Sequence, residues 1–217
     1  EKTNPHSVFT KSHLLSSALQ IFFAGVETTS TTLYYSLLIL LKHPDVTAKF
    51  QEEIDRVIGQ NRSSTMKDKS SMQYTEAIMH EIHRFTDLLP LGVPRKTVRE
   101  VTLKGYTIPQ GINVFPLLSS VLKDPTCFKY PTEFNPENFL NENGEFQKNE
   151  AYMPFAAGKR NCPGEPMARM TLFLFLTTIL QNFDLKSSVP LEELDITPLV
   201  SGLGNLPRNY KCAFITR

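Results

Sequence analysis

The chain contains no tryptophan, only three cysteines among its 217 residues, and almost no excess charge, since its formal net charge is +1. The near-neutral charge gives no reason to expect nucleic acid as a partner. The cysteines are widely spaced and odd in number, so they form neither a zinc-binding CxxC pattern nor a disulfide framework. A reducing environment is therefore expected for Cys127, Cys162 and Cys212.

Long apolar runs are also lacking. No stretch reaches about 18 apolar residues, the length needed to span a bilayer, and polar residues interrupt the two best candidates, Ala18–Val26 and Leu33–Leu41. The chain has no signal-peptide pattern and no initiator methionine, and residues 1–9 have the composition of a linker. We therefore expect the C-terminal part of a longer protein whose N-terminal half is missing.

Helical patterns dominate what is present. Thr10 suits the N-cap of a long first helix, and the residue before Pro44 ends that helix because it avoids the helical region. Gly59 follows the second helix as a C-terminal stop. Helices are predicted over residues 10–42, 44–58, 72–85, 117–122 and 163–182. On the second helix, the residues assigned to the exposed polar face are Gln51, Glu52, Glu53, Asp55 and Arg56.

Strand patterns occupy a smaller part of the chain. Between residues 90 and 115, β-branched and aromatic residues alternate with glycine and proline. Short strands in one small sheet are predicted at Val93, 97–98, 101–103, 106–108 and 114–115, and two further strands near 183–186 and 211–216. The predicted fold class is mainly α with a minor β-sheet, in one domain that takes in all 217 residues.

Cys162 stands out among the three cysteines. Gly158 and two alanines precede it, and Pro163 suits the first position of the following helix. Helix-terminal N–H groups, together with Lys159 and Arg160, favour a thiolate over a thiol. Such a cysteine is a nucleophile, a redox sensor, a soft-metal ligand or, as is commonest for a lone cysteine, a small buried side chain without chemistry.

The segment Ala24–Thr29 breaks the usual rules inside the first helix. Gly25 costs about 1 kcal/mol relative to alanine in a helix interior. Glu27 is a carboxylate that follows the mostly apolar stretch Leu19–Val26. Five consecutive hydroxyl residues, Thr28 to Thr32, come directly after it. Hydroxyl side chains bond back to helix carbonyls and bend the helix. Broken local rules of this kind often mark function, and the alternative is a solvated helix face.

Glu81 and Arg84 lie three residues apart on the third predicted helix. Opposite charges at this spacing share one helix face. Most such pairs are exposed and contribute little to stability. The pair alone therefore does not indicate a function or a family.

Four motifs in order resemble those of the cytochrome P450 superfamily. Phe155, Gly158, Arg160, Cys162 and Gly164 match the haem-binding signature FxxGxRxCxG. AGxETT around Glu27, and ExxR at Glu81, match two further family motifs. The usual PERF segment reads PENF here, so Asn138 stands at the arginine position. The flanks are similar to the vertebrate microsomal drug- and steroid-metabolising group, closest to its family 2, and the resemblance covers essentially the whole chain.

The resemblance implies a role for each matching residue. Cys162 would be the axial thiolate ligand of haem b, iron protoporphyrin IX, with Phe155, Gly158, Gly164, Ala24, Arg160 and Arg95 as further cofactor-binding residues. Glu27 and Thr28 would deliver protons during oxygen activation. Glu81, Arg84 and Asn138 would form a buried structural network, with less charge assistance than an arginine at 138 would supply. The expected substrate-pocket residues are Phe22, Phe23, Leu91, Val93, Ser201 and Leu203.

The resemblance also implies an activity. We expect a haem-thiolate monooxygenase that inserts one oxygen atom from O₂ into an apolar xenobiotic, steroid or fatty acid. Electrons would come from NADPH through NADPH–cytochrome P450 reductase, with cytochrome b5 as a further partner, and Lys148, Lys159 and Arg160 are candidates for docking. The expected location is the cytoplasmic face of the endoplasmic reticulum membrane, reached through a membrane anchor in the missing half. The alternatives are a non-catalytic truncated product that lacks haem, and a haem-thiolate isomerase, which the intact Glu27–Thr28 pair disfavours.

Overall fold

The computed structural model describes residues 9–217, so the linker expected over residues 1–9 lies, apart from Phe9, outside the described residues. The first element is the long helix α1 (Lys11–Lys42), which crosses the molecule diagonally. The Thr10 hydroxyl oxygen accepts a hydrogen bond from the backbone N–H of His13 at 3.1 Å, which confirms the predicted N-cap. The helix ends at His43, before Pro44, as predicted.

Four helices form the core. The C-terminal half of α1 packs with α2 (Pro44–Val57), α3 (Gln73–Thr86) and α5 (Glu165–Asn182). Their apolar faces meet in one cluster because each helix has apolar residues at helical spacing. The fully buried members include Tyr35, Ile39, Phe50, Ile54, Met72, Ile78, Leu172, Phe173, Leu176 and Leu180.

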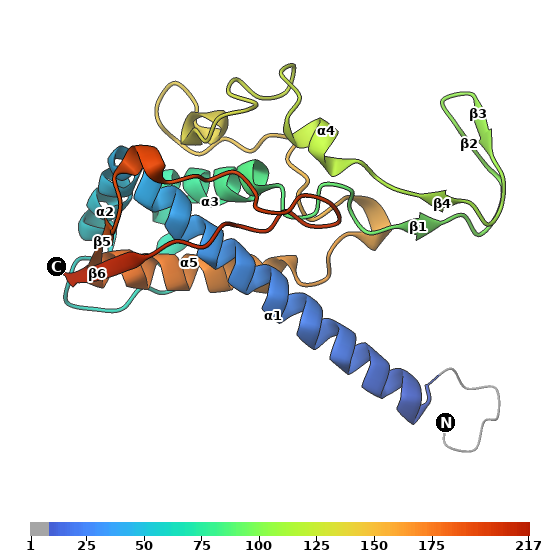
Figure 1. Cartoon of the computed structure of the whole chain (residues 1–217), viewed down its shortest axis with the longest axis horizontal. Coiled ribbons are helices and arrows are strands. Elements are labelled where there is room, and N and C mark those ends of the chain that lie inside the picture. Colours follow the sequence, from blue (N-terminus) through green and yellow to red (C-terminus); the bar gives the residue numbers. More distant parts are fainter. Residues whose placement is uncertain (1–8) are drawn as a thin grey trace.

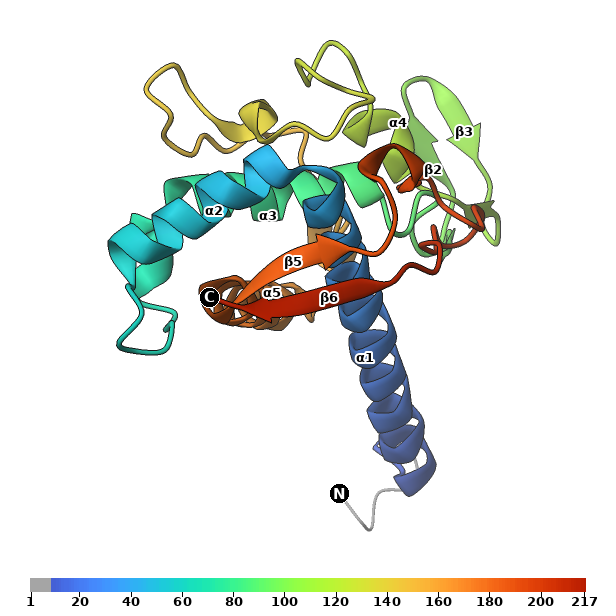
Figure 2. The same ribbon diagram turned by 60° about the vertical axis from the view of Figure 1, so that its left-hand side comes forward.

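Among residues 9–217, the N-terminal half of α1 has no such partner. Figures 1 and 2 show it extending away from the other elements, and the buried residues of α1 begin only at Thr32. Its exposed apolar side chains are Leu14, Leu15, Leu19, Ile21, Phe22, Phe23 and Val26. Within residues 9–217, no helix has the length and apolar character that a membrane crossing requires.

The strands form three separate antiparallel pairs, so the prediction of one small sheet was wrong. β1 (Arg95–Lys96) pairs with β4 (Asn113–Val114), β2 (Val101–Leu103) pairs with β3 (Tyr106–Ile108), and β5 (Phe183–Ser187) pairs with β6 (Cys212–Thr216). Val93 and the 97–98 segment are not strands: Val93 and Val98 lie in bends, and Thr97 bonds to residues 111 and 112 just beyond the β1–β4 pair without extending it. The overall class, mainly helical with small sheets, is confirmed.

The polar face of α2 also needs one correction. Glu53, which we expected to be exposed, is only 6% exposed. Its carboxylate accepts hydrogen bonds from the backbone N–H groups of Tyr74 at 3.1 Å and Thr75 at 2.7 Å, at the start of α3. Those N–H groups have no partner inside their own helix, so a carboxylate from the neighbouring helix satisfies them.

A short helix and several 3₁₀ turns lie in the connections between the larger elements. The helix α4 (Leu118–Leu122) follows β4, and a 3₁₀ turn, Pro136–Phe139, contains the PENF segment. Two more 3₁₀ turns, Asp68–Ser71 and Leu191–Glu193, lie in other connections. The 3₁₀ turn Gly158–Arg160 forms part of the cysteine loop itself.

Candidate functional site

The loop before α5 folds back on itself and presents Cys162 at the surface. Ala156 and Gly158 have φ values of +63° and +75°, in the left-handed region that glycine tolerates best. The backbone N–H of Cys162 donates to the Phe155 carbonyl at 2.9 Å and closes the loop. Cys162 is a free, exposed cysteine, and a Cβ placed on Gly164 would lie 3.8 Å from its sulfur. The loop therefore offers the sulfur with little side-chain bulk around it.

The predicted helix start at Pro163 was wrong by two residues. The helix α5 begins at Glu165 with Gly164 as its N-cap, and Pro166 rather than Pro163 occupies its first turn. Pro163 and Gly164 form a turn instead, in which the Cys162 carbonyl accepts from the Glu165 N–H at 3.5 Å. Cys162 thus precedes the first helical residue by three positions, and its sulfur lies 3.8 Å from the point where a Cβ on the N-cap Gly164 would stand.

The structure brings Arg95 to the cysteine loop from a distant part of the chain. Its guanidinium donates to the Arg160 backbone carbonyl at 2.8 Å, so β1 lies against the loop. Arg160 is exposed, as are Lys159 and Gly158. Two guanidinium groups therefore stand beside the cysteine loop, where they can bind carboxylates.

The unusual segment of α1 stays helical. The Thr28 hydroxyl donates to the Ala24 carbonyl at 2.7 Å, and the Ser30 hydroxyl donates to the Val26 carbonyl at the same distance. Glu27 is exposed, and a Cβ built on Gly25 would meet no atom within 4 Å. Glu27 is therefore accessible, whereas the hydroxyl protons of Thr28 and Ser30 are used inside the helix.

Glu81 and Arg84 are fully buried and pair at 2.7 Å, unlike most pairs of this spacing. Asn138, at the arginine position of the motif, donates from its side-chain amide to both Glu81 oxygens at 3.2 and 3.3 Å. Its carbonyl oxygen accepts from the Tyr130 N–H at 2.8 Å. Burial raises the pKa of the Glu81 carboxyl, and the hydrogen bonds from Arg84 oppose that shift. Asn138 thus joins the network without adding charge.

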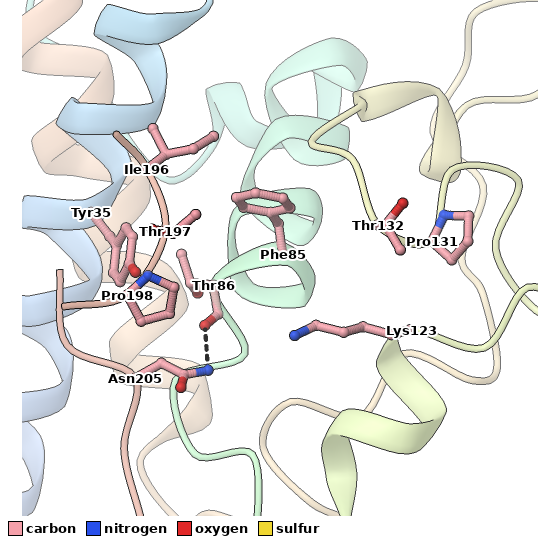
Figure 3. Close-up of a pocket in the computed structure, with 10 residues that line it drawn as sticks. All are labelled: Tyr35, Phe85, Thr86, Lys123, Pro131, Thr132, Ile196, Thr197, Pro198 and Asn205. Carbon is pink, nitrogen blue, oxygen red and sulfur yellow. Dashed lines mark hydrogen bonds between the residues drawn. The ribbon is translucent and has the colours of Figure 1, made fainter. Parts of the chain in front are cut away.

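The expected substrate-pocket residues do not enclose a cavity in this chain. Phe23, Val93 and Leu203 are each more than 60% exposed, Ser201 is exposed and Leu91 is half-buried. A cavity of about 220 Å³ lies elsewhere, among Tyr35 of α1, the end of α3, the 123–132 segment and the C-terminal segment (Figure 3). None of the expected pocket residues lines it. Its lining includes Tyr35, Phe85, Lys123, Pro198 and Asn205.

Two histidines of α3, His80 and His83, are buried beside the cysteine loop. The Nδ1 atoms of His80 and His83 lie 2.8 and 2.7 Å from the carbonyls of Glu76 and Met79. Burial lowers the pKa of His80 to about 3 and that of His83 to about 4. Both rings are therefore neutral at physiological pH, and charging them opposes folding.

This burial predicts a stability that falls in acid. An unfolded histidine titrates near 6.5. Below that pH the histidines of the unfolded chain bind protons, whereas His80 and His83 in the folded chain stay unprotonated. The free energy of unfolding should decrease as pH falls from about 6.5 toward 4, with a limiting slope of about 1.4 kcal/mol per pH unit for each histidine. Urea unfolding of this chain at pH 7, 6 and 5 measures the slope. His80→Gln and His83→Gln should each flatten it, and an unchanged slope in both would contradict the assignment.

Comparison with known proteins identifies the family. The sequence model described as Cytochrome P450 matches residues 1–214. Cytochrome P450 2C11 of Rattus norvegicus is 54% identical over 215 residues, which cover 99% of this chain and 43% of that protein. Cytochrome P450 2G1 of Oryctolagus cuniculus is 50% identical over 217 residues, which cover 100% of this chain and 44% of the relative.

The chain belongs to the cytochrome P450 family, as its motifs indicated. Cytochrome P450 2B19 of Mus musculus is a further relative, 52% identical over all 217 residues. The chain spans less than half the length of the curated relatives it matches. Members of this family hold haem through a cysteine thiolate.

The residues present fit such a group. Cys162 offers one soft sulfur donor on an open loop, and Gly25 leaves free space on α1. Arg95 and Arg160 supply cations for carboxylates, and the exposed Phe23 and Val26 supply apolar surface. A planar apolar group with an iron centre and acidic substituents matches this combination of donors.

Proposed function

We propose that the full-length protein is a haem-thiolate monooxygenase that inserts one oxygen atom from O₂ into an apolar organic substrate. The observation that carries the proposal is Cys162, held exposed on a closed loop beside Arg95 in a chain of the cytochrome P450 family. When bound, haem supplies the redox chemistry, and a thiolate ligand donates electron density that favours O–O cleavage. The protein residues bind that group, orient the substrate and move protons.

Each residue has a definite task in this proposal. Cys162 would ligate the iron, Arg95 and Arg160 would bind the propionates, and Phe155 would pack near the sulfur. Gly158 and Gly164 would allow close backbone approach, and Ala24 would contact the cofactor from α1. Glu27 is exposed and can exchange protons with water, and the Thr28 hydroxyl lies one residue further along the helix. This order suits a proton relay toward the cofactor face.

The substrate class and partners are part of the same proposal. The relatives' similarity and the apolar side chains of Phe23, Val93 and Leu203 support an apolar xenobiotic, steroid or fatty acid. NADPH–cytochrome P450 reductase would supply electrons, with cytochrome b5 as a further donor, at the endoplasmic reticulum membrane. Lys159 and Arg160 are exposed in the cysteine loop, Lys148 is exposed earlier in the chain beside Glu150, and all three can dock an acidic partner.

Substrate oxidation by the full-length protein tests the function directly. The haem-loaded protein is combined with reductase, NADPH and ¹⁸O₂, and the product of an apolar test substrate is analysed by mass spectrometry. Incorporation of one ¹⁸O atom per product molecule supports the proposal. Water-derived oxygen, or rearrangement without NADPH consumption, would instead indicate a hydrolase or the isomerase alternative.

Thr28→Ala should uncouple NADPH consumption from product formation. The substitution removes the hydroxyl of the residue that follows Glu27, so in the proposed relay proton transfer would proceed through less ordered water. We expect product per NADPH to fall about tenfold, because positioned proton donors commonly contribute 10²-fold or more and water replaces part of that. Ser30→Ala is the matched control, since its hydroxyl makes the same i−4 bond at 2.7 Å. Equal coupling in both variants would argue against the relay.

A second candidate is a non-catalytic product that consists of these 217 residues and lacks haem. The exposed apolar half of α1 favours it, because an uncovered apolar surface needs a partner. Titration of the isolated chain with haem separates the two candidates. Tight stoichiometric uptake with a thiolate-type spectrum would exclude the second one.

A further inference from the structure

Arg169 lies on the second turn of α5 and contacts the cysteine loop from behind. Its guanidinium carbon lies over the Phe155 ring at 5.4 Å and over the Tyr152 ring at 5.1 Å from the respective centroids. Both rings belong to the segment that leads into the cysteine loop, and Tyr152 is buried. A planar cation over two aromatic rings gains both stacking and electrostatic attraction.

Polar contacts fix the plane of this guanidinium. Nε of Arg169 donates to Glu165 at 2.9 Å, and Nη2 lies 2.8 Å from the same carboxylate oxygen. Nη1 lies 2.9 Å from Nε2 of His80. Because an arginine can only donate, His80 must accept through Nε2 and carry its proton on Nδ1, where the Glu76 carbonyl accepts it at 2.8 Å. The neutral histidine thus links α3 to the guanidinium.

The Phe155 ring is held on a second side by α3. The His83 ring packs against it with centroids 5.0 Å apart. The carbonyl of the same Phe155 accepts the backbone N–H of Cys162 at 2.9 Å. The ligand cysteine is therefore one hydrogen bond away from a residue clamped between α3 and α5. A shift of the Phe155 backbone would therefore disturb the hydrogen bond that holds Cys162.

We infer that Arg169 is a positioning residue: by stacking on Phe155 and Tyr152 while His80 and Glu165 hold its plane, it fixes the loop that presents Cys162 to the iron. The inference rests on the proposed haem-thiolate function and deepens it. Arg169 does not touch the cofactor in this role. It acts by limiting the movement of the loop, so its loss should appear in the persistence of the sulfur–iron bond. The contact would be difficult to find from the sequence, because only the i, i+4 spacing of Glu165 and Arg169 marks it.

The test follows the lifetime of thiolate ligation in the full-length, haem-loaded protein. The reduced carbonyl complex is prepared, and its conversion from the thiolate-type spectrum to the spectrum without thiolate is timed at a fixed, mildly elevated temperature. Arg169→Ala should convert about tenfold faster, the effect expected from the loss of a partly buried cation–aromatic stack. Arg169→Lys keeps the charge but not the plane and should fall between alanine and wild type. Glu165→Gln keeps an oxygen that can accept from Arg169, and so keeps the plane and the stack while it removes the charge, and it should stay within about twofold of wild type.

Arg217→Ala is the matched control. The Arg217 side chain is 20% exposed against 22% for Arg169, and it pairs with Asp55 at 2.6 Å as Arg169 pairs with Glu165. It lies at the opposite end of α5, where it donates to the Leu180 carbonyl. Its loss affects general stability without touching the cysteine loop, so its conversion rate should match wild type.

The outcomes separate the inference from the proposed function. If wild type gives no thiolate-type spectrum, the proposed function fails. If wild type gives it and Arg169→Ala converts no faster than Arg217→Ala, only the positioning role fails. Equal acceleration in Glu165→Gln would also overturn the role, because it would assign the effect to the ion pair. If the alanine variant does not take up haem, the lysine variant decides: a rate equal to wild type rejects the role, and faster conversion supports it.

Discussion

Cys162→Ala in the full-length protein should abolish both the thiolate-type spectrum of the reduced carbonyl complex and substrate oxidation. Alanine has no donor atom, and a haem that stays bound without the thiolate lacks the electron donation that favours O–O cleavage. Because the Cys162 side chain is exposed and its loop is closed by a backbone hydrogen bond to Phe155, the substitution removes little packing. The fold should survive, so the loss reports on ligation.

Cys127→Ala is the matched control for this experiment. Cys127 is also a free, exposed cysteine, and it lies in a different loop, within 3.7 Å of the Thr126 hydroxyl. Its replacement should leave both the spectrum and product formation as in wild type. Cys162→Ser, which keeps the size of the side chain, should lose the thiolate-type spectrum like alanine. A thiolate-type spectrum that persists in either Cys162 variant would show that another residue binds the iron.

Most helix boundaries could be predicted from the sequence because they depend on interactions between residues that are close together in the chain. Thr10 caps α1 and Pro44 ends it, since capping hydrogen bonds and proline sterics involve only neighbouring residues. The start of α5 could not be located in this way, because either Pro163 or Pro166 fits a first turn. The burial of Glu53 was also missed, since it depends on the start of α3 lying beside α2.

The candidate site likewise has a part that the sequence predicts and a part that only the structure shows. The motif around Cys162 marks the loop in the sequence, but nothing local shows that Arg95 reaches the Arg160 carbonyl from 65 residues away. The same holds for Arg169, whose partners Phe155 and His80 come from the loop and α3. Long-range contacts of this kind arise from helix packing, which a pattern of neighbouring residues does not determine.

Arg84→Ala should be the most destabilising single substitution outside the cysteine loop. The Arg84 and Glu81 side chains are both 0% exposed, and the guanidinium donates to the carbonyls of Leu122, Pro131 and Glu133 at 2.7–2.9 Å as well as to Glu81. Removing it leaves a buried carboxylate and several carbonyls without their donor. Breaking a buried pair in this way costs about 3–5 kcal/mol, a large share of the stability of an ordinary domain.

Urea unfolding of the variants separates this network from an ordinary ion pair. Arg62→Ala is the control, because Arg62 binds Asp68 with the same two-pronged geometry, at 2.7 and 2.8 Å, from a side chain that is 46% exposed against 0% for Arg84. Water reaches the Arg62 side of that pair, so its loss should move the unfolding midpoint much less than the loss of Arg84. Replacing both partners, as Glu81→Gln with Arg84→Met, should destabilise less than Arg84→Ala, because no buried charge is left unpaired. If Arg62→Ala and Arg84→Ala shift the midpoint equally, burial is not the source of the effect, and the carbonyls of 122–133 are held by other contacts.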